Sequence, residues 1–299
     1  MVLPQRAAPG GNIKILYIAG SGRSGTTILA RLLGEVQGFV SVGEAARYLL
    51  DLNLQEKHLP CACGQPVPSC AFWKDLVPLV SPEQAATGTE LVRMRRFPSL
   101  LRNSTQSSVA QQYRPILDAI AEVYRRILDR DGDHVVVDSS KNPSNALLLS
   151  LAPEVELHVL HVVRNPHDVV SSWTKKKGYL AVHPARKVIA WWWSYNLLSE
   201  ALKRCAKTYR LLRYEDFVEH PGTSLADITA DIMGSSLPLP FLSGSEATVH
   251  LQHVLGGNPD KMESGKIKIG PANKSSNGSK RLMVDLLTFP LQYRYHYLP

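Results

Sequence analysis

A glycine-rich run near the start of the chain has the residue types and spacing of a phosphate-binding loop. Residues 20–27 read GSGRSGTT and separate an apolar, β-branched run, Ile13–Ala19, from a segment with helical spacing that begins at Thr26. When a strand leads through such a loop into a helix, backbone N–H groups and the positive helix end form a cradle for an anion. The glycines let the backbone approach that anion closely. The sequence therefore predicts that residues 20–27 bind a phosphate group.

This loop differs from the loop of nucleoside triphosphatases at one position. Its spacing resembles G-x-x-x-x-G-K-[ST], but Thr26 replaces the lysine that reaches the β- and γ-phosphates. The basic residue of the loop is Arg23 instead. The difference argues against ATP or GTP hydrolysis, and a ligand that is not a triphosphate needs no carboxylate that binds Mg²⁺.

A second cationic position lies in the second half of the chain. Arg164 ends an apolar strand pattern, and Ser172 follows about two turns into a helix opened by Pro166, with Ser171 as the alternative hydroxyl. An arginine and a hydroxyl together suit a further phosphate. In isolation an arginine at a strand end is as often a surface ion-pair partner, so this assignment depends on the first motif. The lysines at 175–177 are expected to be solvated.

Together these motifs resemble those of sulfotransferases that use 3′-phosphoadenosine-5′-phosphosulfate (PAPS). GSGRSGTT is similar to the family's 5′-phosphosulfate loop, PxSGTT, with Arg23 at x and Gly22 in place of the proline, a change that should loosen the turn without removing a contact. The strand–Arg–helix–Ser pattern resembles the one that binds the 3′-phosphate. The resemblance implies that the donor is bound by Gly22, Arg23, Ser24, Gly25, Thr26, Thr27, Arg164 and Ser172.

The resemblance also implies a catalytic base. Sulfuryl transfer requires removal of the acceptor's proton and neutralisation of charge on the sulfate oxygens. Glu44 follows the predicted strand Phe39–Val42, at the edge of the sheet where ligand loops gather. A Gly-Glu at this place resembles the base of tyrosylprotein and bacterial carbohydrate sulfotransferases, whereas none of the ten histidines matches the motif of the hormone-type branch. A helix N-cap is the alternative role for Glu44.

Weaker matches extend the resemblance along the chain. Lys141, in Asp-Ser-Ser-Lys, matches a lysine that acts electrostatically near the sulfate beside Arg23, with a solvent-exposed turn lysine as the alternative. Tyr214, in Tyr-Glu-Asp, matches a tyrosine near the nucleotide base, with a packing aromatic as an equal alternative. Residues 253–259 (HVLGGNP) resemble a late family loop, and Lys261, Lys266 and Lys268 beyond it could close over the nucleotide.

A cysteine-rich segment offers four potential zinc ligands, namely His58, Cys61, Cys63 and Cys70. A single residue between Cys61 and Cys63 is unusual for a structural zinc site, where two to four are typical. Similar segments occur in bacterial sulfotransferases. We therefore expect a local fold with Phe72 and Trp73 in a core, and no metal in the site or in the reaction. The run of tryptophans at 191–193 is expected to pack in the core and at interfaces.

The elements needed to position these residues alternate along the chain. Strand patterns occupy 13–19, 39–42, 134–137, 156–163 and 209–213, and helical patterns occupy 26–33, 44–54, 107–130, 144–151, 166–176 and 184–206. Alternation of this kind predicts an α/β fold, a three-layer P-loop-type parallel sheet flanked by helices. We expect a flexible N-terminus (1–12) and one sulfotransferase domain (13–299). Within that domain we expect an irregular insertion at about 55–103 and a segment, 256–280, that is mobile without ligand.

Composition restricts the possible functions. The chain has 299 residues and a formal net charge of +8, which suits a polyanionic ligand but also nucleic acid or an acidic membrane surface. It has no apolar run long enough to span a membrane, no signal-peptide pattern and too few cysteines for a secreted disulfide framework, so we expect a cytoplasmic protein.

The predicted function is transfer of a sulfuryl group from PAPS to an acceptor hydroxyl of a small molecule, carbohydrate or lipid, without a metal. The alternatives are a P-loop nucleotide kinase-like phosphotransferase and, because of the positive charge, a basic nucleic-acid-binding protein, although no RNA- or DNA-binding motif is present.

Overall fold

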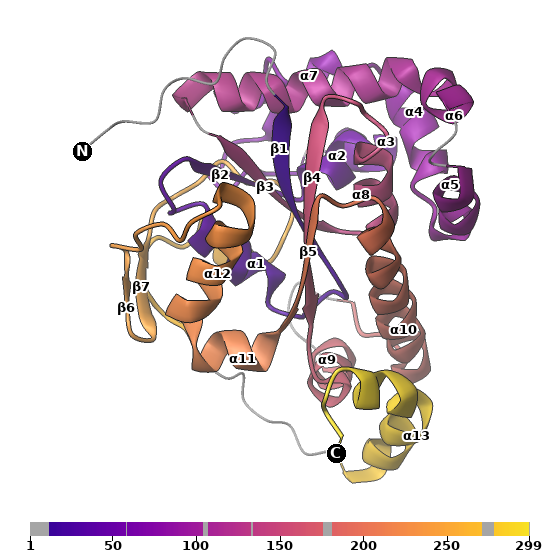
Figure 1. Cartoon of the computed structure of the whole chain (residues 1–299), viewed down its shortest axis with the longest axis vertical. Coiled ribbons are helices and arrows are strands. Elements are labelled where there is room, and N and C mark those ends of the chain that lie inside the picture. Colours follow the sequence, from indigo (N-terminus) through magenta and orange to yellow (C-terminus); the bar gives the residue numbers. More distant parts are fainter. Residues whose placement is uncertain are drawn as a thin grey trace.

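A parallel five-stranded sheet forms the centre of the molecule (Figure 1). The computed structural model describes residues 12–57, 59–103, 107–132, 134–175, 181–270 and 278–298. Across the sheet the strands run in the order β2 (Phe39–Gly43), β3 (Val135–Lys141), β1 (Ile13–Ala19), β4 (Val155–Val163) and β5 (Thr208–Arg213). All neighbouring strands are parallel. The predicted parallel sheet is confirmed.

The central strand β1 is buried on both faces. Ile13, Ile15 and Tyr17 pack into one hydrophobic core, while Leu16 and Ile18 pack into the other. Side chains alternate between the two faces of a strand, so a continuous apolar run requires a cover on each side. This is why the pattern of the first strand predicts helices on both faces of the sheet.

Two helical layers supply these covers. One face packs against α2 (Ala45–Leu49), α7 (Arg114–Asp131), α8 (Pro143–Leu149) and α10 (Ala185–Ala201). The other packs against α1 (Thr26–Leu33), α11 (Tyr214–Glu219) and α12 (Pro221–Met233), which lie on the opposite side of the sheet in Figure 1. The fold is therefore a three-layer α/β sandwich, as predicted.

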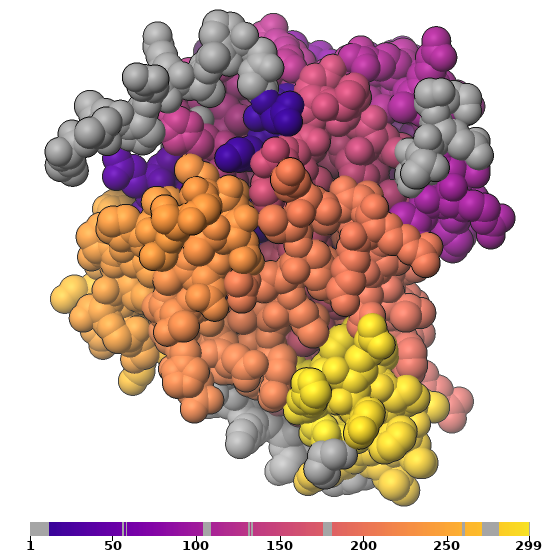
Figure 2. Space-filling model, in the orientation of Figure 1, coloured from indigo at the N-terminus to yellow at the C-terminus, as the bar shows by residue number. Residues whose placement is uncertain are grey.

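Two peripheral units complete the molecule. An antiparallel sheet of β6 (Leu242–Ser243), β7 (Glu246–Val249) and β8 (Gly265–Lys268) packs beside α1. The C-terminal helix α13 (Gly278–Arg294) packs on α9 (Pro166–Thr174) and α10, and it covers one corner of the surface in Figure 2. Among the described helices, none is both long and apolar enough to cross a membrane.

Two of the predicted helices are interrupted. The segment 107–130 forms α6 (Ser107–Gln112) and α7, which starts anew at Arg114 with a proline in its first turn. A proline lacks the N–H that would continue the preceding helix. The segment 44–54 forms α2 and α3 (Leu52–Glu56), because Asp51 accepts a hydrogen bond from the backbone of Asn53 and caps a new helix.

The segment 55–103 is more regular than its sequence indicates. It contains α4 (Pro82–Leu91), which begins with a capping box between Ser81 and Gln84, and α5 (Phe97–Asn103). Trp73 is fully buried in the same core as β1, as expected, and Phe72 packs against that core. Part of the segment expected to be mobile forms β8, while residues 271–277 and 1–11 lie outside the described residues.

Candidate functional site

The carboxyl ends of four parallel strands meet along one cleft of about 1220 Å³. Strand β1 leads into the glycine-rich loop, β2 is followed by Glu44, β3 ends at Lys141 and β4 is followed by Arg164. Residues from all four positions line the cleft. Ligands of open α/β sheets bind at this edge, so the fold brings the predicted site residues together.

The glycine-rich loop has a tight left-handed backbone. Gly25, the N-cap of α1, has φ 85°, and Arg23 has φ 72°, an uncommon value for a residue with a side chain. A Cβ on Gly25 would lie 2.2 Å from the ring of Tyr214, so only glycine fits there. Gly22, Arg23, Gly25, Thr26 and Thr27 line the cleft.

Ser24 is the loop residue that departs from this arrangement. Its side chain is fully buried, and its hydroxyl lies 2.9 Å from the hydroxyl of Ser21. It is not among the residues lining the cleft. The side chain of Ser24 therefore braces the loop from behind, and only its backbone could contribute to an anion cradle.

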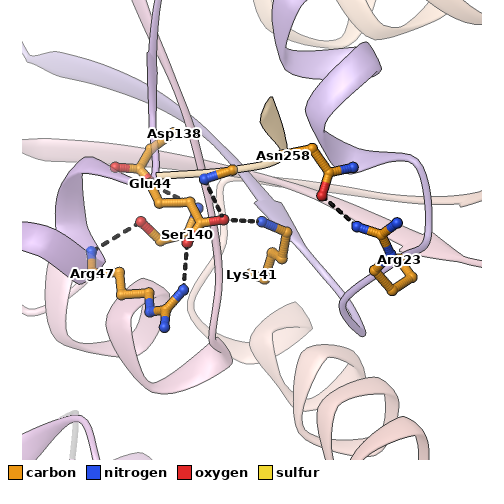
Figure 3. Close-up of polar contacts among 8 residues, drawn as sticks. Arg23, Glu44, Arg47, Asp138, Ser140, Lys141 and Asn258 are labelled. Atoms are coloured by element: carbon orange, nitrogen blue, oxygen red, sulfur yellow. Dashed lines mark hydrogen bonds and ion pairs between the residues drawn. The ribbon is translucent and has the colours of Figure 1, made fainter. Parts of the chain in front are cut away.

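Arg23 connects three segments that are far apart in the sequence. Its Nε donates to the hydroxyl of Ser172 in α9 at 3.0 Å, and its guanidinium also donates to the side-chain oxygen of Asn258, a contact drawn in Figure 3. The backbone oxygen of Arg23 accepts from Arg164 at 3.0 Å. The two arginines predicted to bind opposite ends of the donor therefore open into the same cleft. Ser171 lines the cleft too, but Ser172 is the serine in contact with Arg23.

Arg164 is held at the cleft with spare hydrogen-bonding capacity. It is only 8% exposed, its guanidinium lies 4.6 Å above the ring of Tyr214, and Asp168 is 3.6 Å away. Its Nε has no hydrogen-bond partner among the described residues. A buried charged donor without an acceptor is costly, so nearby negative charge such as that of Asp168 stabilises the guanidinium.

Tyr214 is packed at the edge of the cleft. The ring packs between Gly25 and Arg164, its hydroxyl donates to the carbonyl of Gly270 at 3.3 Å, and it lines the cleft. Burial raises the pKa of Tyr214, so the phenol stays neutral. It is a packing aromatic whose ring also forms part of the cleft wall.

The carboxylate of Glu44 accepts three hydrogen bonds (Figure 3). Its Oε1 accepts from the ammonium of Lys141 and from the N–H of Gly257 at 3.0 Å, and its Oε2 accepts from Arg47 at 2.6 Å. The residue occupies the N-cap position of α2, yet its carboxylate makes no capping hydrogen bond. The carboxylate thus points toward the cations of the cleft and does not act as a helix cap.

The charge state of Glu44 follows from this environment. Burial by itself would raise the pKa of Glu44, but the charges of Lys141 and Arg47 and their hydrogen bonds outweigh it and hold the pKa below its usual value. The carboxylate is therefore ionised at neutral pH, as a proton acceptor must be. It becomes a stronger base when one of its cationic partners turns to another anion.

The end of β3 fixes the position of Glu44. Asp138 is fully buried; its Oδ2 accepts from the N–H of Ala46 at 2.8 Å and from the hydroxyl of Tyr124 at 2.7 Å. The hydroxyl of Ser140 accepts from the N–H of Arg47 at 3.0 Å. Burial raises the pKa of Asp138, which these hydrogen bonds oppose. Together they attach the first turn of α2 to the sheet.

Lys141 belongs to the strand and not to a solvent-exposed turn. The sequence pattern ended this strand at residue 137, but β3 extends through Lys141, where φ is 67°. This left-handed backbone at a non-glycine residue costs about 1–3 kcal/mol and is typical of functional sites. The strained residue delivers its ammonium to Glu44 inside the cleft.

The remaining residues singled out in the sequence are lysines and tryptophans, and only some of them line the cleft. Lys266 and Lys268 line the cleft, whereas Lys261 is buried and donates to the carbonyl of Pro60 at 3.0 Å. Trp191 and Trp192 line the cleft as well, and Trp192 is fully buried. Lys175 is exposed, while residues 176 and 177 lie outside the described part of the chain.

Sequence reasoning missed three contributors. Arg47 pairs with Glu44 at the i, i+3 spacing of a helix, a signal present in the sequence. Asn258 and Gly257 belong to the late Gly-Gly-Asn-Pro segment, but no local pattern shows that they contact Arg23 and Glu44. Their role depends on a long-range approach of two loops.

The chain is similar to several solved structures. A search of curated protein sequences finds no match. Among solved structures, a sulfotransferase domain from the olefin synthase of Synechococcus PCC 7002 is 18% identical, with 97% of this chain and 98% of that chain covered and a TM-score of 0.49. A sulfotransferase domain from the curacin biosynthetic pathway is 16% identical, with 96% and 99% covered and a TM-score of 0.48. A sulfotransferase from Alicyclobacillus acidocaldarius is 14% identical, with 97% and 96% covered and a TM-score of 0.46.

A family model decides the assignment. The model described as "Sulfotransferase family" matches residues 16–232, a span that begins in β1 and ends in α12 and so includes the glycine-rich loop, Glu44, Lys141 and Arg164. The match covers more than half of the chain, and the chain belongs to the Sulfotransferase family.

Proposed function

We propose that this protein transfers a sulfuryl group from PAPS to the hydroxyl of a small molecule, carbohydrate or lipid. One observation carries the proposal: a single cleft contains two cationic side chains, Arg23 and Arg164, together with an ionised carboxylate, Glu44, paired with Lys141. PAPS carries anions at both ends of an adenosine. Two cationic positions with a base beside one of them match those requirements.

The donor would be held at its two anionic ends. The N–H groups at the start of α1 and the guanidinium of Arg23 would bind the 5′-phosphosulfate. Arg164 and Ser172, which both line the cleft, would bind the 3′-phosphate. Tyr214, which packs against both Gly25 and Arg164, would lie near the adenine.

The reaction would be an in-line displacement at sulfur. Glu44 takes the proton of the acceptor hydroxyl while the hydroxyl oxygen forms a bond to sulfur. The bond between sulfur and the 5′-phosphate oxygen breaks, and adenosine 3′,5′-bisphosphate leaves with that electron pair. Arg23, Lys141 and the loop N–H groups stabilise the charge on the sulfate and bridging oxygens. No metal takes part in these steps.

The contact between Lys141 and Glu44 would couple donor binding to activation of the base. Without ligand, the ammonium of Lys141 is used by Glu44. When a sulfate enters, Lys141 can turn to its oxygens. Loss of that positive neighbour raises the pKa of Glu44 and makes the carboxylate a better proton acceptor at the moment it is needed.

The alternatives fit the cleft less well. A nucleotide kinase needs a cation for the β- and γ-phosphates and a site for Mg²⁺, and the loop has Thr26 where that lysine would stand. A nucleic-acid-binding surface needs a basic stripe, whereas Arg23 and Lys141 are engaged inside the cleft with Asn258 and Glu44. The cleft also includes apolar and aromatic side chains, which support an organic acceptor: Tyr48, Leu54, Leu59, Val92, Trp191 and Tyr195.

The proposal is tested with PAPS labelled in the sulfuryl group. The purified chain is incubated with labelled PAPS and a metabolite extract in buffer without Mg²⁺, and labelled products are separated by chromatography. We expect label in an organic product together with release of adenosine 3′,5′-bisphosphate. Transfer of phosphate from ATP that requires Mg²⁺, with no transfer from PAPS, would show that the chain is a phosphotransferase instead.

A further inference from the structure

Four metal-binding side chains converge next to the cleft, outside the residues that line it. Cys61, Cys63, Cys70 and His253 place three Sγ atoms and one Nδ1 atom within 4.8 Å of one another. The Sγ atoms of Cys63 and Cys70 are 3.7 Å apart, and the Nδ1 of His253 lies 3.8 Å from the Sγ of Cys61 and 3.4 Å from that of Cys70. His253 comes from a loop far along the chain from the cysteines.

These spacings are those of a tetrahedral zinc site. With Zn–S bonds of about 2.3 Å and Zn–N bonds of about 2.05 Å, a tetrahedron has edges of roughly 3.8 Å between two sulfurs and roughly 3.6 Å between sulfur and nitrogen. The three distances given above match these edges, and the other three ligand pairs lie within 4.8 Å. A disulfide requires about 2.05 Å between sulfurs, and all three cysteines are free.

We propose that Cys61, Cys63, Cys70 and His253 bind one structural zinc ion. The sequence favoured His58 as the fourth potential ligand and made zinc the less favoured interpretation because one residue separates the first two cysteines. His58 lies outside the described residues, and His253 provides the imidazole that completes a Cys₃His set. Such sets with four protein ligands are structural, because they leave no open position for a substrate.

The local backbone accounts for the short spacing. The N–H of Gly64 donates to the carbonyl of Cys61 at 2.9 Å, and the N–H of Cys61 donates to the carbonyl of Gln65 at 2.9 Å, which forms a tight knuckle. Gly64 has φ 85° and open space around it. This left-handed turn places the thiols of Cys61 and Cys63 on the same side, facing Cys70 and His253.

The surroundings support the ligands in the way that metal sites require. The ring of His253 stacks on Phe72 with 5.3 Å between centroids, and the indole N–H of Trp73 donates to its backbone oxygen at 2.8 Å, so its orientation is fixed. Three thiolates and a neutral imidazole give a zinc complex a net charge of about −1. The ammonium of Lys261, bound to the carbonyl of Pro60 beside Cys61, lies where it offsets that charge.

The ion would fix the loop that carries Gly257 and Asn258 against the catalytic cleft. Two residues beyond His253, Leu255 accepts from the N–H of Glu44 at 2.7 Å and donates to Val42 at 3.1 Å. Gly257 and Asn258 then contact Glu44 and Arg23. The proposed metal site does not depend on the proposed function. Only the expected influence of the metal on donor binding rests on the proposed function.

The test is metal content. The full chain is purified from cells grown with zinc, and bound metal is measured by mass spectrometry for the wild type, Cys63→Ser, His253→Asn and the control Cys205→Ser, whose cysteine lies outside the cluster. We expect one zinc per chain in the wild type and in Cys205→Ser. We expect at least a tenfold weaker retention of zinc against a chelator in the other two variants.

Cobalt provides a second measurement that needs no variant. The wild-type chain, exchanged with Co²⁺, is expected to show thiolate-to-metal charge transfer and the intense visible absorption of a tetrahedral site. A wild-type chain without zinc and without this cobalt spectrum would overturn the proposal, as would a disulfide among these cysteines. Neither readout uses PAPS, so a chain that binds zinc but transfers no sulfate would refute the proposed function alone.

Discussion

Replacing Glu44 with glutamine is expected to lower turnover of sulfuryl transfer by about 10²- to 10⁴-fold and to leave the affinity for adenosine 3′,5′-bisphosphate largely unchanged. Glutamine keeps the shape of the side chain and can still accept hydrogen bonds from Lys141 and Gly257 through its oxygen. It cannot take a proton from the acceptor. The loss should therefore fall on kcat and not on donor binding.

The measurement is a single-turnover assay with labelled PAPS, combined with calorimetric titration of the bisphosphate. Glu219→Gln is a matched control, because Glu219 is exposed at the end of α11, outside the cleft. Bisphosphate affinity also reports whether the variant is folded, since the cations of Lys141 and Arg47 lose their anionic partner. If Glu44→Gln kept wild-type turnover, the assignment of the base would be wrong.

Replacing Arg164 with methionine is expected to weaken binding of adenosine 3′,5′-bisphosphate by about 10- to 100-fold. Hydrogen bonds to charged groups contribute about 1.5–3 kcal/mol, and each 1.4 kcal/mol is about a tenfold change in Kd. Methionine retains an apolar stem against the ring of Tyr214. The loss should therefore come from the guanidinium and not from a cavity.

Adenosine 5′-monophosphate is the matched control ligand for this variant. It lacks the 3′-phosphate, so its affinity should change little when Arg164 is replaced. The comparison is informative because Arg164 also donates to the backbone oxygen of Arg23 in the phosphate loop. If bracing of that loop were its whole contribution, both ligands would weaken equally, and the second anion site would not exist at Arg164.

The sequence was sufficient to predict the parallel sheet and the edge of it at which the site residues lie. An apolar run such as Ile13–Ala19 must be buried on both faces, and the alternation of strands and helices then requires a parallel sheet. The carboxyl ends of such strands share one edge, so Arg23, Glu44, Lys141 and Arg164 could be placed near one another without coordinates. The cleft contains all four.

Contacts between loops that are distant in the sequence could not be predicted from local sequence patterns. Nothing in the spacing of residues 253–258 indicates that this loop pairs with the end of β2, so Asn258, Gly257 and His253 were not assigned. Proximity in sequence favoured His58 beside the cysteines, although the fold brings His253 to them. Helical propensity also predicted one continuous helix where the structure has two. A cap at Asp51 and a proline after Arg114 each start a new helix.

The most direct test compares two nucleotides on the unmodified protein. The central claim is that the cleft recognises an adenosine with phosphates at its 3′ and 5′ positions. Isothermal titration calorimetry with adenosine 3′,5′-bisphosphate and with ATP measures this preference without any knowledge of the acceptor. We expect the bisphosphate to bind more tightly than ATP, with or without Mg²⁺; tighter binding of ATP would contradict the claim.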